Sequence, residues 1–592
     1  MSEIRPRIGI MCDMSGIRPC IGIVCDMSEI RPCIGIMCDM SEIRQLVDRR
    51  KPYGTIVGFR KRFEMTDLKN EIKRRRTFAI ISHPDAGKTT LTEKFLLYGG
   101  AINLAGSVKG RKAQKHAVSD WMQIEKERGI SVTSSVMQFE YDDMCINILD
   151  TPGHQDFSED TYRTLMAADS AVMVIDGSKG VEAQTIKLFK VCVMRKIPIF
   201  TFINKMDREA NDPFELIDEI ETVLGIRTCP INWPIGSGKA FKGVYDRQSG
   251  VISRFIQGDN GHKTESVEAK LGDEGLDELL TKPLHDKLAE DVELLDGASD
   301  EFDLERVQRG ELSPVFFGSA LTNFGVEIFL KHFLAMTTSP LPRKSDIGTI
   351  DPFSDDFSAF VFKIQANMNK AHRDRIAFMR ICSGKFDAGK EVYHVQGGRK
   401  IRLTQPQQMM AQERKHVEEA YAGDIIGVFD PGIFAIGDTI CTPGKKFAYE
   451  GIPTFAPEHF ARIRQVDTMK RKQFIKGIEQ IALEGAVQIF QEYNTGMEEI
   501  IVGVVGVLQF DVLSFRLENE YNVEIRMEQL PYEHIRWIKN ENIDVSSLSV
   551  TSDTKRIKDL KGNPLLLFTH PWSIKTVLER NEGLELSEFG TN

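Results

Sequence analysis

The loop Ser82–Thr89 holds the residue types with the clearest chemical potential in this chain. Gly87 lets a phosphate approach the backbone, the Lys88 ammonium can reach terminal phosphates, and the Thr89 hydroxyl can be a ligand of Mg²⁺. The first amides of the helix expected over Lys88–Tyr98 point at the same anion. The spacing therefore predicts a phosphate-binding loop made of Ser82, His83, Pro84, Asp85, Ala86, Gly87, Lys88 and Thr89.

A second group of reactive residues begins at Asp150, which ends an apolar run. A carboxylate at the carboxyl end of a strand beside a phosphate loop can hold Mg²⁺. Gly153 leaves an amide for a γ-phosphate, and His154 stands where an attacking water is positioned. This group consists of Asp150, Thr151, Pro152, Gly153 and His154, with His154 as the candidate catalytic residue. The expected metal ligands are Thr89, Asp150 and a second hydroxyl, from Ser131 or Thr133.

A third group selects the base. The Asp207 carboxylate can accept two hydrogen bonds from guanine, whereas adenine would leave it unpaired. Lys205 can lie along the purine face, and Asn204 can tie this loop to the phosphate loop. The amides of Ser319 and Ala320 are offered to the guanine O6. The sequence thus predicts a GTP or GDP site completed by Asn204, Lys205, Met206, Asp207, Ser319 and Ala320.

The elements that must position these loops are short apolar runs separated by helical patterns, which indicates a parallel sheet whose loops meet at one edge. The expected strands are Thr77–Ile81, Cys145–Asp150, Ala171–Ile175, Pro198–Ile203 and Val315–Phe317. Val181–Met194 is an expected helix between two of them. The first part of the chain is therefore predicted to be an α/β P-loop GTPase domain.

With these motifs in this order, the chain resembles the translational GTPases, and over about residues 65–592 it is similar to the bacterial class II peptide chain release factors. The resemblance depends on long strings, which begin at Ser82, Asp120 (Asp-Trp-Met), Asp156 (Asp-Phe-Ser-Glu-Asp-Thr-Tyr-Arg-Thr), Trp233 (Trp-Pro-Ile-Gly), Phe362 (Phe-Lys-Ile-Gln-Ala-Asn-Met) and Val505 (Val-Gly-Val-Leu-Gln-Phe-Asp-Val). Two positions depart from the wider superfamily: Ser82 replaces a leading glycine, and Ser131 stands where elongation factors carry threonine.

The resemblance implies a translation termination factor that hydrolyses GTP to GDP and phosphate when the ribosome stimulates it. Its implied partners are ribosomal RNA and proteins, and the codon-reading class I release factors that it ejects after peptide release. Lys88, Mg²⁺ and the loop amides would neutralise the developing phosphate charge while His154 orients the water. No arginine finger is evident, so slow intrinsic turnover is expected.

Two other classes of protein stay open on the sequence. A translocating elongation factor or a ribosome-protection protein shares the motifs, although such chains carry two further domains. An ATP-dependent kinase or a non-catalytic nucleotide-binding scaffold is the alternative outside the family. Asp207 argues against ATP, and the combined Mg²⁺ and water-positioning residues argue against lost catalysis.

The composition is that of an ordinary globular protein, with 592 residues, 41% hydrophobic and 27% charged. We find no signal peptide and no apolar run near 18 residues, so a cytoplasmic monomer without a membrane partner is expected. The formal charge of −10 argues against a chain that coats nucleic acid through its overall charge, and no DNA partner is expected. The ten cysteines form no Cys-x-x-Cys pair, which fits a reducing compartment.

Within the first 64 residues, Met1–Asp13, Met14–Asp26 and Met27–Asp39 are near-copies with a period of 13, and a fourth copy begins at Met40. Such short copies cannot build a core, and their five cysteines suggest a metal site only weakly. We interpret residues 1–64 as a duplicated extension, disordered or not translated. Met65, before a helix expected over Asp67–Arg76, is a candidate start.

The remaining chain predicts two more domains. Residues 65–341 would be the GTP-binding domain, with an acidic insertion at about 230–312 that includes helical runs over Leu276–Leu295. Residues 350–450 have the strand-and-turn spacing of an antiparallel β-barrel, and residues 455–592 predict an α+β domain. Its expected elements include a helix over Met469–Phe490, a strand over Tyr521–Arg526, and a helix between them. Two basic runs, Lys73–Arg76 and Lys470–Lys472, either meet ribosomal RNA phosphates or are solvated.

Overall fold

The structure is a computed structural model. It describes residues 67–100, 125, 131–257, 264–273, 275–367, 374–410, 413–452, 454–493, 500–540 and 543–588. The chain divides into two units, Met1–Glu64 and Met65–Asn592, and every described residue lies in the second. The 13-residue repeats and the Asp120-Trp-Met string lie outside the described residues. None of the helices among the described residues combines the length and apolar character needed to cross a bilayer.

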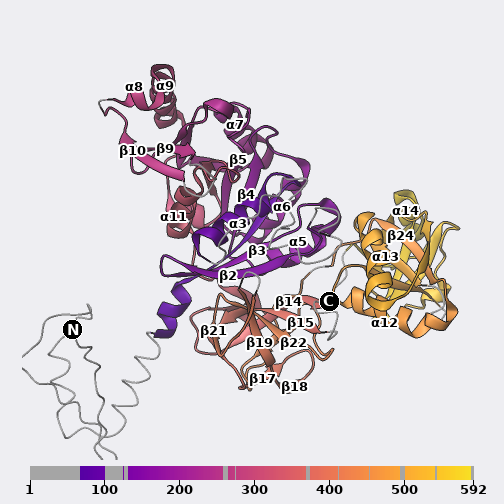
Figure 1. Cartoon of the computed structure of the whole chain (residues 1–592). Coiled ribbons are helices and arrows are strands. Elements are labelled where there is room, and N and C mark those ends of the chain that lie inside the picture. Colours follow the sequence, from indigo (N-terminus) through magenta and orange to yellow (C-terminus); the bar gives the residue numbers. More distant parts are fainter. Residues whose placement is uncertain are drawn as a thin grey trace, which may run out of the picture. The chain divides into compact units, whose positions relative to one another are not determined.

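A seven-stranded sheet organises the amino-terminal part of this unit (Figure 1). Its strands, in spatial order, are β2 (Ser135–Tyr141), β3 (Met144–Asp150), β1 (Arg75–Ser82), β4 (Ser170–Asp176), β5 (Ile199–Asn204), β11 (Leu312–Phe317) and β6 (Arg227–Pro230). β2 pairs antiparallel with β3, and the other neighbours are parallel. The predicted P-loop α/β fold is confirmed.

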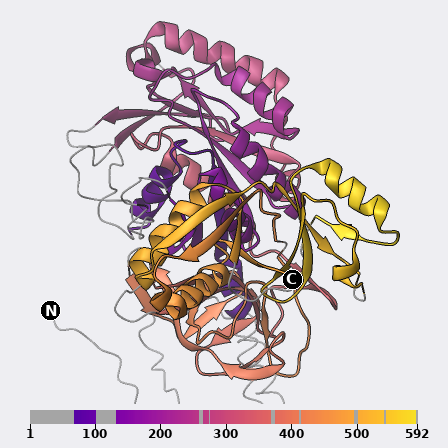
Figure 2. The ribbon, with the colours of Figure 1, turned by 90° about the vertical axis from the view of Figure 1, so that its right-hand side faces the viewer.

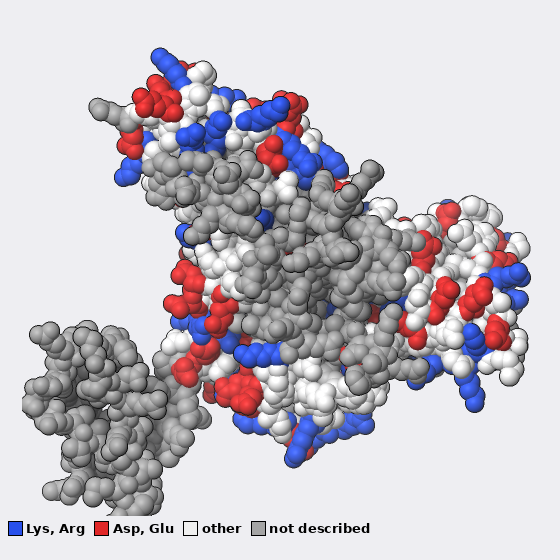
Figure 3. All heavy atoms as spheres, in the orientation of Figure 1, with Lys and Arg blue, Asp and Glu red and all other residues white. Residues whose placement is uncertain are grey.

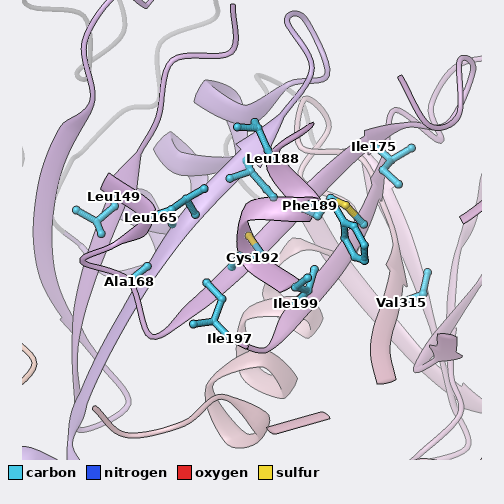
Figure 4. Packing of buried hydrophobic residues seen from close by; sticks show 14 of the residues in the cluster. Leu149, Leu165, Ala168, Ile175, Leu188, Phe189, Cys192, Ile197, Ile199 and Val315 are labelled. Carbon is cyan, nitrogen blue, oxygen red and sulfur yellow. The ribbon is translucent and has the colours of Figure 1, made fainter. Parts of the chain in front are cut away.

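Alternating residues of β1 show why helices cover both faces of this sheet. Phe78 and Ile80 pack into one apolar cluster, while Ala79 and Ile81 pack into another (Figure 4 shows part of the second). A strand buried on both faces reads as a continuous apolar run, as this one does. The first cluster includes residues of α3 (Lys88–Tyr98) and α11 (Val326–Met336), and the second those of α5 (Ser158–Leu165), α6 (Ala183–Arg195) and α7 (Pro213–Leu224).

An additional antiparallel sheet lies in the chain between β6 and β11, where the sequence predicts an insertion. Its strands are β7 (Asn232–Ile235), β8 (Gly243–Asp246), β9 (Val251–Gln257) and β10 (Thr264–Lys270), followed by α8 (Leu276–Leu280), α9 (Lys282–Ala298) and α10 (Leu304–Gln308). The Asn232 side chain both donates to and accepts from the Phe317 backbone, at 3.1 and 2.6 Å. This pair attaches the inserted sheet directly to the end of β11.

The next part is an antiparallel β domain, as predicted, in the form of a half-barrel. Its eight-stranded sheet contains β14 (Ser358–Ala366), β15 (Arg375–Ser383), β17 (Glu391–His394), β18 (Arg399–Arg402), β19 (Thr404–Met410), β20 (Glu413–His416), β22 (Ile425–Phe429) and β23 (Thr439–Cys441). Two small pairs accompany it: β12 (Arg343–Ser345) with β13 (Gly348–Ile350), and β16 (Lys385–Asp387) with β21 (Glu419–Tyr421).

The carboxyl-terminal part is the predicted α+β domain (orange to yellow in Figure 2). Its antiparallel sheet comprises β24 (His459–Gln465), β25 (Gln488–Glu492), β26 (Ile500–Val504), β27 (Ile525–Leu530), β28 (His534–Ile538), β29 (Thr554–Asp559), β30 (Pro564–Phe568) and β31 (Leu586–Ser587). Its helices are α12 (Arg471–Leu483), α13 (Leu508–Tyr521) and α14 (Pro571–Arg580).

Three of the expected elements differ from the structure in ways that have a clear local cause. The helix predicted over Met469–Phe490 ends at Leu483, because Gly485 takes a left-handed φ of 76°, and the chain then enters β25. The strand predicted from Tyr521 starts at Ile525, after Asn522 caps α13 with a φ of 56°. The helix predicted to Arg76 covers residues 67–73 among those described, and β1 begins at Arg75 after a turn at Arg74.

The two basic runs differ in exposure. Arg75 is buried and its Nε lies 3.1 Å from Asp424 Oδ2, so it is no surface cation. Arg471 and Lys472 are exposed. On the face shown in Figure 3, Lys and Arg side chains lie interspersed with Asp and Glu. The basic side chains of the described residues therefore do not form one continuous positive patch on that face.

Candidate nucleotide-binding site

A cavity beside the loops that follow β1, β3 and β5 brings the three predicted groups together. Residues from all three line it: Ser82, His83, Pro84, Asp85, Gly87, Lys88, Thr89, Ser131, Gly153, His154, Asn204, Lys205 and Asp207. The carboxyl ends of parallel strands meet at one edge of a sheet, which is where α/β proteins bind ligands. Residues far apart in the sequence thus share one pocket.

The phosphate loop has the backbone geometry that its glycine permits. Gly87 has a φ of 97°, and a Cβ there would lie 2.2 Å from Asn204 Nδ2. Asp85 is also left-handed, with a φ of 65°. Ser82 is buried, and its hydroxyl donates to the His83 carbonyl at 2.8 Å. Ser82 therefore acts within the loop, while Gly87 allows the loop and the Asn204 side chain to touch.

Lys88 lies between the phosphate loop and the segment after β3. Its ammonium donates to the Thr151 carbonyl and lies 3.9 Å from Asp150 Oδ1, and its side chain is only 6% exposed. The Thr151 hydroxyl donates to the Ile80 carbonyl at 2.7 Å, and the Pro152 carbonyl accepts from Thr161 at 3.3 Å. The segment 150–152 is thereby fixed to β1 and α5, with a buried cation beside it.

The three candidate Mg²⁺ ligands occupy two positions. Thr89 and Ser131 line the cavity, and Asp150 is buried behind it at the end of β3. Two hydroxyls and a carboxylate are the hard oxygen donors that Mg²⁺ prefers alongside phosphate oxygens. Thr133, the alternative to Ser131, instead donates to Glu125 Oε1 from its amide at 3.1 Å and its hydroxyl at 3.4 Å. The donor set therefore fits Mg²⁺, with Ser131 the better placed hydroxyl.

Asn204 joins the base-binding loops to the phosphate loop, as the sequence predicts. Its Nδ2 donates to the Ala86 carbonyl at 2.8 Å, and its Oδ1 accepts from the Ala320 amide at 2.8 Å. The Met206 side chain is buried, and its amide donates to the Gly318 carbonyl at 3.1 Å. The Asn204 side chain therefore connects its own loop to the phosphate loop and to the loop that contains Ala320.

Asp207 and Lys205 are both held by contacts that the sequence analysis did not predict. The Ser319 hydroxyl donates to Asp207 Oδ1 at 2.6 Å, which fixes the carboxylate that would read guanine. Lys205 Nζ lies 2.5 Å from Asp176 Oδ2. Burial raises the pKa of Asp176, but hydrogen bonds from Lys205 and Ser178 outweigh it and hold that pKa below its usual value.

The amides of Ser319 and Ala320 are engaged within the protein. Ser319 N donates to the Phe324 carbonyl at 2.9 Å, and Ala320 N donates to Asn204 Oδ1 at 2.8 Å. Contact between either amide and a guanine O6 would need a shared hydrogen bond or a shift of this loop. The Ser319 side chain, rather than its amide, makes the contact that orients Asp207.

His154 stands at the rim of the cavity, at the start of a short 3₁₀ turn over Gln155–Phe157. Its side chain is 31% exposed, and its Nδ1 lies 3.3 Å from the Asp156 amide and 3.2 Å from Asp156 Oδ1. Gly153 precedes it, and a Cβ there would lie 3.3 Å from Pro84 Cα and 3.7 Å from Lys88 Nζ. Gly153 and His154 thus face the phosphate loop.

Sequence reasoning missed three supporting acids. Glu125 Oε1 accepts from the amides of Val132 and Thr133, at 2.9 and 3.1 Å, and so fixes the chain next to Ser131. No local pattern marks Glu125 among its charged neighbours. Asp176 ends a predicted strand beside the strand that carries Asn204, a signal that was available. Asp156 lies two residues beyond His154 and is 5% exposed.

Comparison with protein families matches three successive segments. The Elongation factor Tu GTP binding domain matches residues 73–340, and Elongation factor G domain 2 matches residues 356–443. The C-terminal domain of the class II release factor RF3 matches residues 449–578. The order of these segments is that of the α/β, half-barrel and α+β parts of the fold.

Curated relatives share most of the chain. A peptide chain release factor 3 of Symbiobacterium thermophilum is 60% identical over 521 residues, covering 88% of this chain and 98% of the relative. Those of Gloeobacter violaceus and Acaryochloris marina are 54% and 53% identical over 524 residues, covering 88% of this chain and 98% and 96% of the relatives.

A solved structure supports the fold alone. A crystal structure of a protein from Thermus thermophilus superposes with a TM-score of 0.62 at 22% identity, covering 82% of this chain and 72% of that one. The sequence identity to the curated relatives extends over nearly their whole length, and it shows the family as well as the fold. The chain belongs to the peptide chain release factor 3 family of translational GTPases.

Proposed function

We propose that this protein ejects codon-reading class I release factors from the ribosome after peptide release and then leaves when it hydrolyses GTP. Family membership makes it a GTPase of translation termination that binds guanine nucleotide and acts on the ribosome. The observation that supports the finer role is the convergence of Lys88, His154 and Asp207 on one cavity. Such a cavity suits a switch whose chemistry controls conformation.

We assign the nucleotide's parts to the three groups as follows. The phosphates would lie on the loop Ser82–Thr89, with Lys88 moving from the Thr151 carbonyl to the β- and γ-phosphates. The base would lie against Lys205, with Asp207 accepting from the guanine N1–H and 2-amino group. In that pose a purine with a 6-amino group would leave the Asp207 carboxylate unmatched, which favours GTP over ATP.

Mg²⁺ would be held by Thr89, Ser131 and Asp150 together with phosphate oxygens. When bound, this ion supplies positive charge against the negative charge that develops on the transferring phosphoryl group. Lys88 and the loop amides add to that charge stabilisation. His154 would orient the attacking water from the rim of the cavity, and Gly153 would donate its amide to the γ-phosphate.

The wider assignments are part of the same proposal. We infer a GTP-binding domain over residues 65–341 with an insertion at about 230–312, a barrel domain over 350–450 and an α+β domain over 455–592. The protein would work as a cytoplasmic monomer. Sedimentation of the purified chain, with and without GTP, tests the monomeric state.

The catalytic assignment is tested by ribosome-stimulated hydrolysis. His154→Ala should bind GTP with unchanged affinity and lose about 10²- to 10⁴-fold in stimulated turnover. His285→Ala is the matched control, since His285 lies on α9 and pairs with Asp277 at 2.7 Å. Unchanged turnover in His154→Ala would refute the role assigned to that residue.

The biological role is tested on ribosomes that carry a labelled class I release factor after peptide release. Addition of this protein with GTP should accelerate release of the label, whereas addition with ATP should not. GTP hydrolysis without faster release of the label would keep the GTPase assignment and reject ejection. A nucleotide competition assay on the free protein separates GTP from ATP binding independently.

A further inference from the structure

Asp156 makes two contacts that connect His154 to a distant part of the chain. Its Oδ1 lies 3.2 Å from His154 Nδ1, and its Oδ2 accepts from the Leu508 amide at 2.7 Å. The two residues of the second contact are 352 positions apart in the sequence. Asp156 is 5% exposed. A shielded carboxylate therefore lies between the candidate catalytic histidine and the carboxyl-terminal domain.

The α13 end of this contact is built to receive a carboxylate. Leu508 is the first residue of α13, and the first amides of a helix have no acceptor within it. These amides carry the positive end of the helix dipole, which favours an anion. The Gln509 side chain accepts from the Val505 and Gly506 amides at 2.8 and 3.1 Å, and so fixes the turn before the helix.

Gly506 is required by the closeness of this approach. A Cβ at Gly506 would lie 2.1 Å from Asp156 Cγ and 2.5 Å from its Oδ1. Gly506 is not among the glycines with positive φ, so its backbone would accept another residue. The only demand for glycine here is therefore the space that the Asp156 side chain occupies.

Apolar side chains surround the contact. Val132, Phe157 and Val512 form a small buried cluster, with Leu508 and Phe515 packed against it. Val132 follows Ser131, and Phe157 follows Asp156, so the cluster joins both segments that approach the nucleotide's γ-phosphate position. Low solvent access strengthens the hydrogen bond between Asp156 and Leu508.

We propose that Asp156 is a positioning residue for His154, and that Gly506 and Leu508 of the carboxyl-terminal domain hold Asp156 in place. The inference rests on the proposed role of His154. The Asp156 amide donates to His154 Nδ1 at 3.3 Å, and the Asp156 carboxylate lies 3.2 Å from the same nitrogen. The orientation of the ring therefore follows from the position of Asp156, and Nε2 is the nitrogen left for water. Displacement of α13 would thus turn His154 without touching a nucleotide loop.

Two substitutions test the two parts of the proposal separately: the effect of Asp156 on His154, and the support that the carboxyl-terminal domain gives to Asp156. Asp156→Asn keeps the shape of the side chain but removes its charge, and should lower ribosome-stimulated kcat by about 10- to 100-fold. Gly506→Ala displaces the Asp156 carboxylate from the far side and should lower kcat by about 10-fold. GTP affinity should stay within about 2-fold in both, because neither residue lines the nucleotide cavity.

A double-variant cycle tests whether Gly506 acts through Asp156. In an Asp156→Gly background all three side-chain atoms that a Cβ at Gly506 would meet are gone, so adding Gly506→Ala should change kcat by less than about 2-fold. Gly297→Ala is the matched control, since a Cβ at Gly297 meets nothing within 4 Å. Additive losses would overturn the coupling, and an unchanged kcat in Asp156→Asn would overturn the positioning role. A rise in turnover without ribosomes would also overturn it, since it would make the contact a brake.

Hydrogen exchange separates failure of this inference from failure of the proposed function. Gly506→Ala should raise amide exchange over residues 153–157 in the intact protein, whatever His154 does. Exchange that rises while His154→Ala keeps full turnover would locate the error in the catalytic role. Unchanged amide exchange over residues 153–157 would refute the proposal that the carboxyl-terminal domain holds Asp156 in place. Melting temperatures of all variants show that each is folded.

Discussion

The nucleotide domain contacts the half-barrel and the carboxyl-terminal domain through two interfaces of different construction. The half-barrel interface uses residues at the amino end of β1 and before β4, on the side of the sheet away from the phosphate loop. Arg380 pairs with Asp169, and its Nη1 donates to the Thr77 hydroxyl at 2.6 Å. Arg75 pairs with Asp424 at 3.1 Å. The residues that make these contacts lie within strands or directly before them.

The carboxyl-terminal interface instead uses segments beside the nucleotide. Its contacts include the Asp156–Leu508 hydrogen bond, the Val132–Phe157–Val512 cluster, and Arg163 Nη1 donating to the Gly485 carbonyl at 3.1 Å. The difference teaches that the half-barrel is anchored to the rigid sheet, whereas the carboxyl-terminal domain is connected to segments that a γ-phosphate would order.

One half-barrel residue, Lys363, also contacts a segment close to the nucleotide site. Lys363, on β14 of the half-barrel, donates to the Ser134 carbonyl and lies 3.8 Å from Asp160 Oδ2. Asp160 in turn accepts from the Ser134 amide at 2.6 Å. The half-barrel therefore also touches the segment that follows Ser131, through a single cation.

The largest expected effect comes from breaking the strand-anchored interface. Arg380→Ala leaves Asp169 buried without its main cation, and should lower the free energy of unfolding by about 3–5 kcal/mol. Burial already raises the pKa of Asp169, although Arg380 opposes it. Denaturant unfolding measures the loss. Lys385→Ala, in a partly exposed pair with Glu419 at 2.5 Å, is the control and should cost less than about 1 kcal/mol.

A smaller loss is expected from Gly423→Ala at the same interface. Gly423 has a φ of 107°, and a Cβ there would lie 2.6 Å from Arg75 Cβ and 2.7 Å from Pro340 Cγ. Strain and the forced shift together should cost about 1–3 kcal/mol of unfolding free energy. Thermal unfolding of this variant beside the parent chain checks the value. A neutral result would mean that the half-barrel tolerates displacement, contrary to the anchoring described above.

The carboxyl-terminal interface should respond differently, here to a loss of apolar volume. Val512→Ala removes two methyl groups from the small cluster and should cost about 1–2 kcal/mol. Amide exchange should rise over residues 131–134 and 153–157 but not over β1, and mass spectrometry after hydrogen exchange reads both. A uniform rise across β1 as well would contradict the separation of the two interfaces.

The smallest effect is a dependence on pH at the contact between Lys363 and Asp160. Burial raises the pKa of Asp160, but Lys363 and the Ser134 hydroxyl and amide outweigh it, so the pKa lies below its ordinary 3.8. A carboxylate with a lowered pKa in the folded state stabilises the protein above about pH 4, and that stabilisation is lost as the pH falls through the folded-state pKa. Asp160→Asn should flatten this part of the acid decline, as unfolding curves between about pH 2 and 5 would show. An identical slope in both proteins would exclude Asp160 as a contributor.

The nucleotide loops were predictable because phosphate and base recognition depend on short segments at strand ends. The chemical roles of Gly87, Lys88 and Asp150 could be predicted from residue type and spacing alone. The structure brings the loops that carry these residues together at one cavity. Element bounds were less reliable. The helix predicted through Phe490 ends at Leu483, since the spacing of apolar residues does not reveal the left-handed turn at Gly485.

The sequence by itself determined the fold class, the order of the domains and the family, because strand-loop-helix patterns and long family strings are local properties. Only the tertiary structure decided which groups support the site. Glu125 beside Val132, Ser319 on Asp207, and Leu508 on Asp156 are contacts between residues that no spacing relates. Their geometry follows from how sheets and helices pack, and a hydrogen bond across 352 residues leaves no periodic signal in the chain.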